Sequence, residues 1–256
     1  MYSYSFIQWL LFFYIYCFVG WCIESTIVSF NSKRLVNRGF VRGPILPIYG
    51  FGAIVILFVT IPVGDNPILI YIFGSIGTTI LEFVTGWLME KLFKMKYWDY
   101  SDCKFNIKGY ICLKSSLFWG VLSLFLVFVI HKPIENLVTE TSTLILTIID
   151  ISISAVFIVD LAYAVRTALD VNKLLSAITA AKAEITQLRQ ELAQRIEENE
   201  NAVLLNEKIE KLKLEHKKRI ERLGFFKKDF ILAHPTARSK RFNEALEELK
   251  QKLEKK

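Results

Sequence analysis

The residues of this sequence that could do chemistry are acids that lie inside long apolar runs. Glu82 lies in a run that begins at Pro67, and Asp150 and Asp160 lie in a run that begins at Leu144. A charge at membrane depth is costly, so such an acid normally faces a partner or a wet path. We therefore expect Glu82 to pair with a basic group, to line a polar path, or to lock two helices together. For Asp160, near the end of its run, snorkelling toward the interface is the favoured account.

A pattern of glycine, tryptophan and glutamate closes two of the apolar runs. Residues 20–24 and residues 86–90 both read G-W-x-x-E. Further along, residues 38–41 and 108–111 each give a basic residue, a glycine, an aromatic residue and a β-branched residue. Because the matches come in the same order, they favour two helical hairpins of the same orientation, as in transporters with parallel repeats. The alternative is chance, since these residue types are common at the ends of membrane helices.

The repeated pattern predicts how its polar residues are used. Glu24 and Glu90 lie four residues after their glycines, and they could pair with Arg38 and Lys108, which precede the next apolar runs. The glycines would let neighbouring helices approach closely. We take these four charged residues, together with Glu82, as candidates for binding or transport.

The other candidate residues are aromatic, acidic or basic side chains near the same membrane face. They are Trp21, Trp87, Trp98, Asp99, Arg42 and Lys114. Tryptophan rings favour the membrane interface, where their amphipathic character fits. The aromatic and acidic stretch of residues 98–102 either docks a partner or anchors its loop to the interface, and the second use is the more common.

These side chains need membrane-crossing helices to hold them. A spanning helix takes about 20 mostly apolar residues, because it rises about 1.5 Å per residue across a core about 30 Å thick. The chain has 256 residues, 53% of them hydrophobic, and its long uncharged runs nearly all precede Arg166. We therefore predict an all-α protein whose residues 1–166 form a transmembrane domain. About five segments qualify as spans, namely residues 6–30, 45–63, 67–93, 111–130 and 144–165.

The charge of the loops predicts the orientation. The loops at residues 31–44 and 91–108 are rich in Lys and Arg, whereas those between the other spans are poor in them. Basic loops stay on the cytoplasmic side, so we expect a multi-pass protein with the N-terminus outside and the C-terminus in the cytoplasm. The net charge of +7 favours contact with anionic lipid head groups.

The last third of the chain is predicted to be a cytoplasmic helical tail. Apolar residues recur there at steps of three and four, which predicts a coiled coil with a stutter over residues 167–224. Through residues 170–223 it could pair with a second copy of the chain or fold back on itself. A basic loop and a short helix follow over residues 225–256, where a solvated loop is more common than a site for an anionic lipid or partner.

Several classes of site have no support in the sequence. There is no G-x-x-x-x-G-K-[ST] loop for a nucleotide, no G-x-S-x-G and no H-E-x-x-H. The four cysteines form no C-x-x-C pair and the three histidines lie far apart, so we expect free thiols, no metal site and no cofactor. We also expect no enzyme activity, and no nucleic acid partner because the tail mixes Glu with Lys as solvated helices do.

Several short stretches of the membrane half carry a family resemblance. They are Gly20-Trp21 with Glu24, then residues 37–40 (NRGF), 43–44 (GP), 46–52 (LPIYGFG), 81–83 (LEF), 85–87 (TGW), 98–101 (WDYS), 105–106 (FN), Gly109 and 111–113 (ICL). Over residues 6–140 the chain thereby resembles a bacterial family of ABC-transporter type IV membrane proteins, also called CmpB-type. The resemblance implies a permease in a bacterial cell membrane.

Three functions remain open from the sequence. The first is a permease-like component of a transport system that has no ATPase of its own and works with a separate ATPase or as a homo-oligomer. The second is a membrane-anchored scaffold that acts through its cytoplasmic coiled coil. The third is an intramembrane lipid-handling protein that uses Glu24, Glu82 and Glu90.

Overall fold

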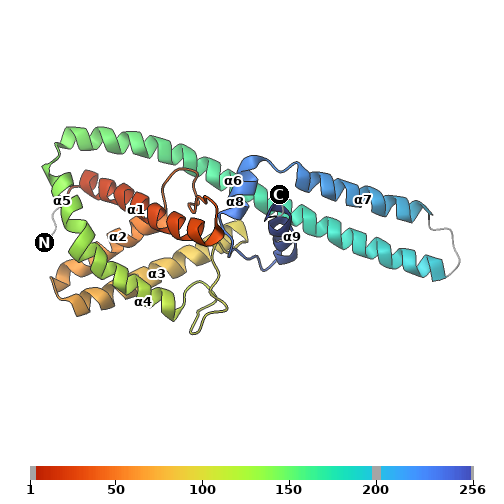
Figure 1. The fold of residues 1–256 in the computed structure, drawn as a ribbon, viewed down its shortest axis with the longest axis horizontal. Helices are drawn as coiled ribbons and strands as arrows, with labels where there is room; N and C mark the ends of the chain where they lie inside the picture. Colours follow the sequence, from red (N-terminus) through yellow and green to blue (C-terminus); the bar gives the residue numbers. More distant parts are fainter. Residues whose placement is uncertain (1–3, 198–202, 255–256) are drawn as a thin grey trace. The chain divides into compact units, whose positions relative to one another are not determined.

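The computed structural model describes residues 4–197 and 203–254, and most of these residues are helical (Figure 1). The chain divides into two compact units. The first, which we call the membrane bundle, comprises residues 1–92 and 96–165. The second, the tail unit, comprises residues 93–95 and 166–256. Each unit is described by itself.

The first hairpin of the membrane bundle consists of α1 (Phe6–Ser32) and α2 (Pro47–Thr60), which a short 3₁₀ turn, η1 (Ile61–Val63), prolongs. α1 begins with a capping box, in which the side chains of Ser5 and Gln8 accept each other's backbone N–H. α2 begins at Pro47, whose fixed φ suits a first turn. The helices pack closely because Gly50 has no side chain, and a Cβ there would lie 2.4 Å from the sulfur of Cys17.

The second hairpin consists of α3 (Pro67–Phe93) and a continuous helical segment of α4 (Leu113–Phe125), a π-helical turn η2 (Leu126–Ile130) and α5 (His131–Glu140). Small residues fill its interface. A Cβ at Gly74 would lie 2.2 Å from Oγ of Ser123, and the hydroxyl of Ser75 donates to the Ser116 carbonyl across 2.7 Å. Close backbone approach of this kind is a usual basis of helix packing in membranes.

α6 (Thr143–Glu197) contributes its first part to the membrane bundle. The core of the bundle brings together Phe12, Leu57, Val138 and Leu146, one each from α1, α2, α5 and α6. Asp150 of α6 is also buried, at 3% exposure, and its carboxyl oxygens have no hydrogen-bond partner among the described residues.

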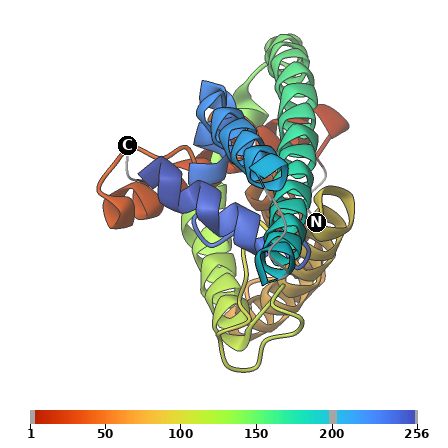
Figure 2. The ribbon, with the colours of Figure 1, turned by 90° about the vertical axis from the view of Figure 1, so that its right-hand side faces the viewer.

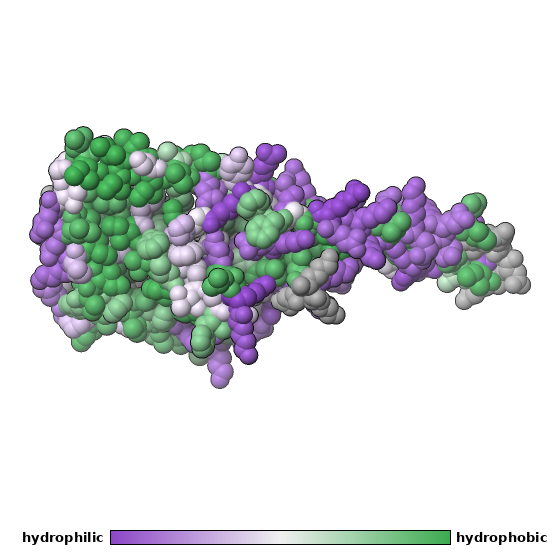
Figure 3. Space-filling view, turned by 45° about the horizontal axis from the view of Figure 1, so that its top comes forward, coloured by the Kyte–Doolittle hydropathy of each residue, from purple (hydrophilic) through white to green (hydrophobic). Residues whose placement is uncertain are grey.

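Four helices of the described residues are long and apolar enough to cross a membrane: α1, α3, the α4–α5 segment and α6. The predicted span at residues 45–63 forms a shorter apolar helix, Pro47–Val63. The predicted span at 111–130 belongs to a helical segment that continues to Glu140. Figure 3 shows hydrophobic side chains covering the membrane bundle on the face in view, whereas those of α7 (Val203–Glu221) are mostly hydrophilic. An apolar outer surface is what a helix bundle in lipid requires.

The tail unit contains the second part of α6, together with α7, α8 (Phe225–Leu232) and α9 (Asn243–Glu254). α7 runs back along α6 (Figures 1 and 2), and Lys208 of α7 lies 3.5 Å from Glu184 of α6. The amphipathic pattern predicted over residues 170–223 therefore falls on two helices rather than one. The connection at residues 198–202 lies outside the described residues.

The basic loop between α8 and α9 is held in place by hydrogen bonds rather than merely solvated. The ammonium group of Lys250 donates to the carbonyls of Pro235 and Ala237 across 3.0 and 2.6 Å. The hydroxyl of Ser239 donates to the Lys94 carbonyl, 2.8 Å away. The loop that carries the cluster of Arg238, Lys240 and Arg241 is thus fixed to α9 and to the segment that follows α3.

Candidate functional site: a carboxylate cluster beside an apolar groove

The first part of the candidate site is Glu24, near the end of α1. We call this end of the bundle the basic end, because the loops that connect the helices there, at residues 33–46 and 94–112, are rich in Lys and Arg. Oε1 of Glu24 accepts a hydrogen bond of 3.0 Å from the hydroxyl of Tyr49, in the first turn of α2. Oε2 of Glu24 lies 3.8 Å from Nε of Arg38, and the two side chains are 33% and 15% exposed. The ion pair expected between Glu24 and Arg38 is therefore present.

The loop at residues 33–46 positions Arg38 through hydrogen bonds to α1. The backbone N–H of Arg38 donates to the hydroxyl of Ser25 across 3.2 Å. The indole N–H of Trp21 donates to Oδ1 of Asn37 across 2.7 Å, and the Asn37 amide donates to the carbonyl of Arg42 across 2.6 Å. Trp21 thus anchors this loop, a role that goes beyond the interfacial position expected of it.

Asp160 of α6 holds the same loop from another side. Its two carboxyl oxygens accept the backbone N–H groups of Arg42 and Gly43 across 3.1 and 2.7 Å. The guanidinium of Arg42 lies over the ring of Tyr163, 5.3 Å from its centroid. Asp160 was expected only to snorkel toward the interface, and the structure instead gives it specific backbone partners. Arg42, a predicted site residue, is exposed and serves the loop through its backbone.

The second part of the site is Glu82 of α3, which is only 5% exposed. Its carboxylate accepts hydrogen bonds from the hydroxyl of Tyr100 across 3.2 Å and from that of Ser115 across 3.0 Å. The indole of Trp119 also donates to it. Within residues 4–197 and 203–254, no Lys or Arg forms an ion pair with Glu82, so neutral donors replace the basic partner that was one expectation.

Two tyrosines join the two carboxylates into one group. Tyr49 donates to Glu24 and also interacts electrostatically with Glu82, while Tyr100 donates to Glu82 and interacts with Glu24. Arg38 interacts with both tyrosines and with Glu24. We call Glu24, Arg38, Tyr49, Glu82 and Tyr100 the carboxylate cluster. With both acids ionised it carries a net charge of −1, so it favours a cation.

Burial shapes the protonation of the loop residues in the cluster. Burial lowers the pKa of the Arg38 guanidinium, while Glu24 acts in the opposite direction. A guanidinium nevertheless stays charged in proteins. Burial and the neighbouring Glu82 both raise the pKa of the Tyr100 phenol. Tyr100 therefore acts in the cluster as a neutral hydrogen-bond donor.

The loop at residues 94–112 positions Tyr100 through its own internal contacts. Lys96 is only 7% exposed. Its ammonium group donates to Oδ1 of Asp99 across 3.2 Å and to the carbonyl of Lys108 across 2.7 Å. The indole N–H of Trp98 donates to the carbonyl of Tyr110 across 2.9 Å. Trp98 and Asp99 were expected to dock a partner or to anchor the loop at the interface. Their observed contacts brace the loop itself.

Two shifts in pKa accompany these loop contacts. Burial raises the pKa of the Asp99 carboxyl, but hydrogen bonds from Ser101 and Lys96 outweigh this effect and leave the pKa lowered. Asp99 therefore stays ionised beside Lys96. Burial and the hydrogen bond to Glu90 raise the pKa of Tyr110 to about 12.

Glu90 lies outside the carboxylate cluster, but it accepts a hydrogen bond from a tyrosine, as Glu24 does from Tyr49. The hydroxyl of Tyr110 donates to Oε2 of Glu90 across 2.6 Å. The same ring covers Gly86, where a Cβ would lie 3.2 Å from it. Lys108, the expected partner of Glu90, is exposed and contributes its backbone carbonyl to Lys96. The second G-W-x-x-E pattern thus uses a tyrosine where a lysine was predicted.

Two further predicted site residues lie on the surface, outside the cluster. Lys114 is exposed in the first turn of α4. Trp87 is 46% exposed on α3, with the ammonium group of Lys91 5.0 Å from its ring. The structure therefore brings together Glu24, Arg38 and Glu82 among the predicted candidates. Trp21 and Glu90 are half-buried on α1 and α3, where they contact Asn37 and Tyr110, and the others lie in loops or on the surface.

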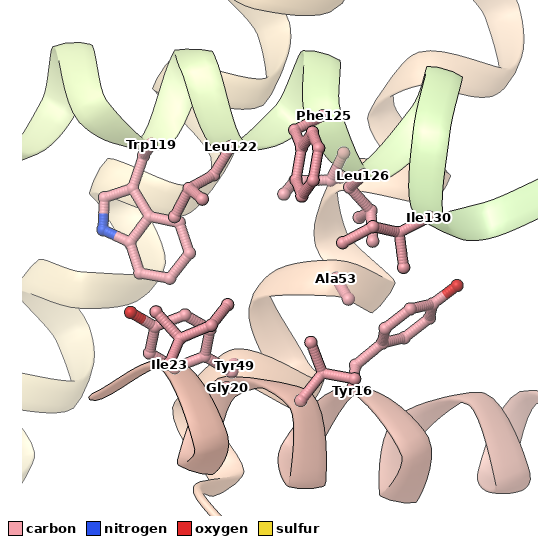
Figure 4. A pocket seen from close by; sticks show the side chains of 12 residues that line it. Tyr16, Gly20, Ile23, Tyr49, Ala53, Trp119, Leu122, Phe125, Leu126 and Ile130 are labelled. Atoms are coloured by element: carbon pink, nitrogen blue, oxygen red, sulfur yellow. The ribbon is translucent and has the colours of Figure 1, made fainter. Parts of the chain in front are cut away.

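An apolar groove starts beside the carboxylate cluster and runs between α1, α2 and the α4–η2 segment (Figure 4). It has an empty volume of about 430 Å³, partly open to the surroundings. Tyr49 and Trp119 lie at the end near the cluster, and Tyr16 and Ile130 lie at the other end, with the hydroxyl of Tyr16 directed away from the groove. The wall between them is aliphatic or aromatic. Its lining residues are Tyr16, Val19, Gly20, Ile23, Tyr49, Ala53, Ile56, Trp119, Leu122, Phe125, Leu126 and Ile130.

The residues that sequence reasoning missed are the neutral donors Tyr49, Tyr100, Ser115 and Trp119. One signal was available: Tyr49 and Trp119 are polar-edged aromatics within apolar runs, where a buried N–H or O–H needs a partner. Tyr100 and Ser115 meet Glu82 only through the fold. Among the described residues, no group of three His, Cys, Asp or Glu side chains could hold a metal ion.

Comparison with known proteins adds one match. The family model described as "Putative ABC-transporter type IV" matches residues 11–165, which run from α1 into α6 and include every residue of the carboxylate cluster. No curated protein and no solved structure matches the chain.

Proposed function

Since the chain belongs to this ABC-transporter type IV family and is embedded in a membrane, we propose that it is a permease-like component of a transport system, without an ATPase of its own. The matched residues cover more than half of the chain. A separate ATPase subunit would supply the energy. Following the distribution of Lys and Arg in the loops, the N-terminus lies outside and the tail unit lies in the cytoplasm, where an ATPase could bind.

The observation that carries the proposal is a polar site that helices of both hairpins build at one end of an apolar groove. Glu24 belongs to α1, Tyr49 to α2 and Glu82 to α3, and Trp119 of α4 reaches both the groove and Glu82. Helices that share a site in this way can open or close it by moving against one another. A site that only locked two helices together would not need to border an open groove.

The chemistry of the site selects a class of solute. The cluster carries two carboxylates against one guanidinium, and the groove beside it is apolar. A solute with one cationic group and an apolar body would place its charge near Glu24 and Glu82 and its body along Ala53 and Leu122. Acids inside membranes commonly mark the paths of ions and substrates.

Binding of radiolabelled tetraphenylphosphonium, an apolar cation, tests this proposal. We expect the full chain in lipid nanodiscs to bind the probe, with affinity at least about tenfold weaker in Glu82→Gln and Glu24→Gln, which corresponds to 1.4 kcal/mol. Glu140→Gln, an exposed acid at the other end of the bundle, is the matched control and should bind like the wild type. Equal binding by all four proteins would contradict the proposal.

Co-purification tests the ATPase partner. The tagged full chain, extracted in mild detergent from cells that encode it, should bring down a protein with a G-x-x-x-x-G-K-[ST] loop. Recovery of the chain alone, with no bound solute and no solute movement after reconstitution, would contradict the transport assignment.

A membrane-anchored scaffold is the second candidate, and one observation favours it. Ile196, at the end of α6, and Val203 and Leu204, at the start of α7, are 60%, 59% and 82% exposed. Exposed apolar groups at the end of a helical hairpin suit a partner or a second copy of the chain. Deletion of residues 170–256 separates the functions: if the phenotype survives this deletion but is lost in Glu82→Gln, the scaffold is excluded.

A lipid-handling role is a third candidate. The apolar lining of the groove would also accommodate an acyl chain, and the basic loops and the loop with Arg238 would favour anionic head groups. The same binding assay in vesicles with and without anionic lipid tests this role. A lipid displaces the cationic probe only if it occupies the groove. Weaker probe binding in the vesicles with anionic lipid would therefore favour lipid handling.

A further inference from the structure

A second polar cluster lies at the end of the groove opposite the carboxylate cluster. His131, the first residue of α5, is only 1% exposed, and both its ring nitrogens have hydrogen-bond partners. Nδ1 lies 2.7 Å from the hydroxyl of Tyr16, and Nε2 lies 3.1 Å from that of Tyr4. The hydroxyl of Tyr4 donates in turn to Oε1 of Glu135, across 2.5 Å. The ring of Tyr16 lines the groove while its hydroxyl is directed away from it, and Glu135 is half-buried, so the row runs from the groove wall to the surface of the bundle.

The directions of these hydrogen bonds fix the tautomer of His131. Tyr4 has one hydroxyl proton, and it is donated to Glu135. The oxygen of Tyr4 must therefore accept from His131, so that Nε2 carries a proton. In a neutral ring Nδ1 is then the acceptor, and Tyr16 donates to it. Every proton in the row points from Tyr16 toward Glu135.

We propose that Tyr16, His131, Tyr4 and Glu135 form a proton wire between the Tyr16 hydroxyl, behind the groove wall, and the surface of the bundle. A proton that arrives on the oxygen of Tyr16 displaces the hydroxyl proton onto Nδ1 of His131. The Nε2 proton passes to Tyr4, and the Tyr4 proton passes to the carboxylate of Glu135. The result is a neutral Glu135 and a neutral His131 whose tautomer is reversed, with all hydrogen bonds kept. The reverse sequence brings a proton from Glu135 to the Tyr16 hydroxyl.

The surroundings of His131 favour hydrogen-bonded transfer over a lasting charge. Among the described residues, the titratable groups with a recorded contact to the ring are Tyr16 on α1, Tyr4 just before α1, and Glu135 on its own helix. The buried cluster around them is apolar in the parts that α2 and α6 contribute, which include Leu57 and Leu146. In such surroundings a charge without a partner is costly, whereas a chain of hydrogen bonds can move a proton at little cost.

The helix that carries His131 has an irregular turn directly before it. Residues Leu126–Ile130 form a π-helical turn, and the N–H of His131 bonds to the carbonyl of Leu126, five residues back. One added residue in a turn rotates the following helix by about 100°, because an α-helix has 3.6 residues per turn. Turns of this kind are frequent at functional sites. Here the first and last residues of the turn, Leu126 and Ile130, also line the groove, and His131 of the wire follows directly after the turn.

Nitrogen-15 NMR of histidine-labelled full chain in lipid nanodiscs tests the wire. At alkaline pH we expect His131 as the Nε2–H tautomer, and on acidification a reversal to Nδ1–H as Glu135 takes up a proton. His234 is an internal reference, because its Nδ1 lies 2.9 Å from the Phe230 carbonyl and must carry a proton at every pH. His131→Gln assigns the signal by removing it.

Three substitutions give the test its control. Tyr4→Phe breaks the row between His131 and Glu135 and should abolish the reversal. Tyr16→Phe removes the donor to Nδ1 and should also abolish it. Tyr14→Phe, on the same helix but bonded to Ser154, should leave the reversal unchanged. An Nδ1–H tautomer at alkaline pH, imidazolium without tautomer reversal, or a reversal that survives Tyr4→Phe would overturn the proposal.

The wire itself stands on the geometry, whereas its use to couple solute and proton movement rests on the proposed function. The two proposals fail separately. Loss of probe binding in Glu82→Gln concerns the basic end of the groove, and the tautomer of His131 is read without any solute.

Discussion

Tyr49 of α2 covers Gly20 of α1 so closely that a Cβ built on the glycine would lie 2.2 Å from the tyrosine ring. The hydroxyl of the same tyrosine donates to Glu24, one turn further along α1. Tyr110 has the same relation to Gly86 and Glu90 in the second hairpin. Glycine and glutamate four residues apart therefore act together, since the glycine makes room for the ring whose hydroxyl the glutamate accepts.

Substituting Gly20 tests this relation. Gly20→Ser would force the Tyr49 ring away from α1, and overpacking of this kind costs about 1–3 kcal/mol. We expect a lower midpoint of thermal unfolding in detergent and a weaker contact between Tyr49 and Glu24. Gly224→Ser is the matched control, because nothing lies within 4 Å of a Cβ there and serine is a good first residue before α8. An equal midpoint for both variants would show that packing of the Tyr49 ring does not require a glycine at residue 20.

A second prediction concerns Asp160 and the loop that carries Arg38. Asp160→Ala would leave the backbone N–H groups of Arg42 and Gly43 without their acceptor, at a cost of about 1–3 kcal/mol. We expect faster amide hydrogen exchange throughout residues 33–46, because this loop would lose its anchor to α6. Binding of the cationic probe should strengthen, since Arg38 would no longer be held beside Glu24 to offset part of the negative charge of the cluster.

The control for this loop is Asp170→Ala. Asp170 pairs with Lys227 across 3.1 Å in the tail unit, where both side chains are more than a third exposed. Exposed ion pairs contribute little, so exchange in residues 33–46 should stay as in the wild type. Unchanged exchange in Asp160→Ala would instead mean that the aspartate only reaches toward the interface.

A third prediction concerns the buried end of Lys250. Lys250→Met removes the donor to the carbonyls of Pro235 and Ala237 and leaves two acceptors unsatisfied, at a cost of about 1–3 kcal/mol. We expect limited proteolysis to cut residues 234–242 faster. Lys252→Met is the control, because Lys252 is 47% exposed and contacts only Glu248 among the described residues. Equal cutting of both variants would contradict a fixed loop.

Much of the membrane bundle could be predicted from sequence because lipid imposes a simple condition. A helix that crosses it must be apolar for many residues, and the runs that begin near Phe6, Pro67 and Leu144 satisfy that condition. The second run, predicted at residues 45–63, ends at Val63 as expected, but its helix, Pro47–Val63, is shorter than the four candidate spans. The tail pattern predicted helical faces and left open whether the tail pairs with a second copy or folds back on itself, because that choice depends on contacts between α6 and α7.

The candidate site was predictable only where partners are near in sequence. Glu24 and Arg38 are separated by one loop, and a basic residue there is an obvious partner for an acid. The burial of Glu82 was predictable as well, because an acid within a long apolar run normally faces the interior of a helix bundle. Its donor Ser115 lies 33 residues further on and depends on how α4 packs, and so does the approach of His131 to Tyr4 across 127 residues. Contacts of this range follow from the fold and leave no local pattern.

The last prediction concerns pH and the tail unit. Glu248 of α9 lies 2.6 Å from the ammonium group of Lys182 on α6 and 3.0 Å from Nε2 of His216 on α7. Burial raises the pKa of this carboxyl, but hydrogen bonds from Lys182, Lys252 and His216 outweigh it and lower the pKa to about 2. A carboxyl whose pKa is lower in the folded state stabilises it fully above the unfolded pKa, and this contribution is lost as the pH falls. The attachment of α9 should therefore weaken between pH 4.5, the ordinary value, and about 2.

Amide exchange in residues 243–254, corrected for intrinsic rates, measures this weakening. In the wild type we expect protection to fall over that pH range, whereas Glu248→Gln should be less protected at neutral pH and lose little more on acidification. Glu210→Gln is the matched control, because its pair with Lys213 lies on the exposed face of α7. Since α9 contacts both α6 and α7 through this one carboxylate, protection in Glu248→Gln that follows the wild-type pH dependence would mean that other contacts attach α9 to the hairpin.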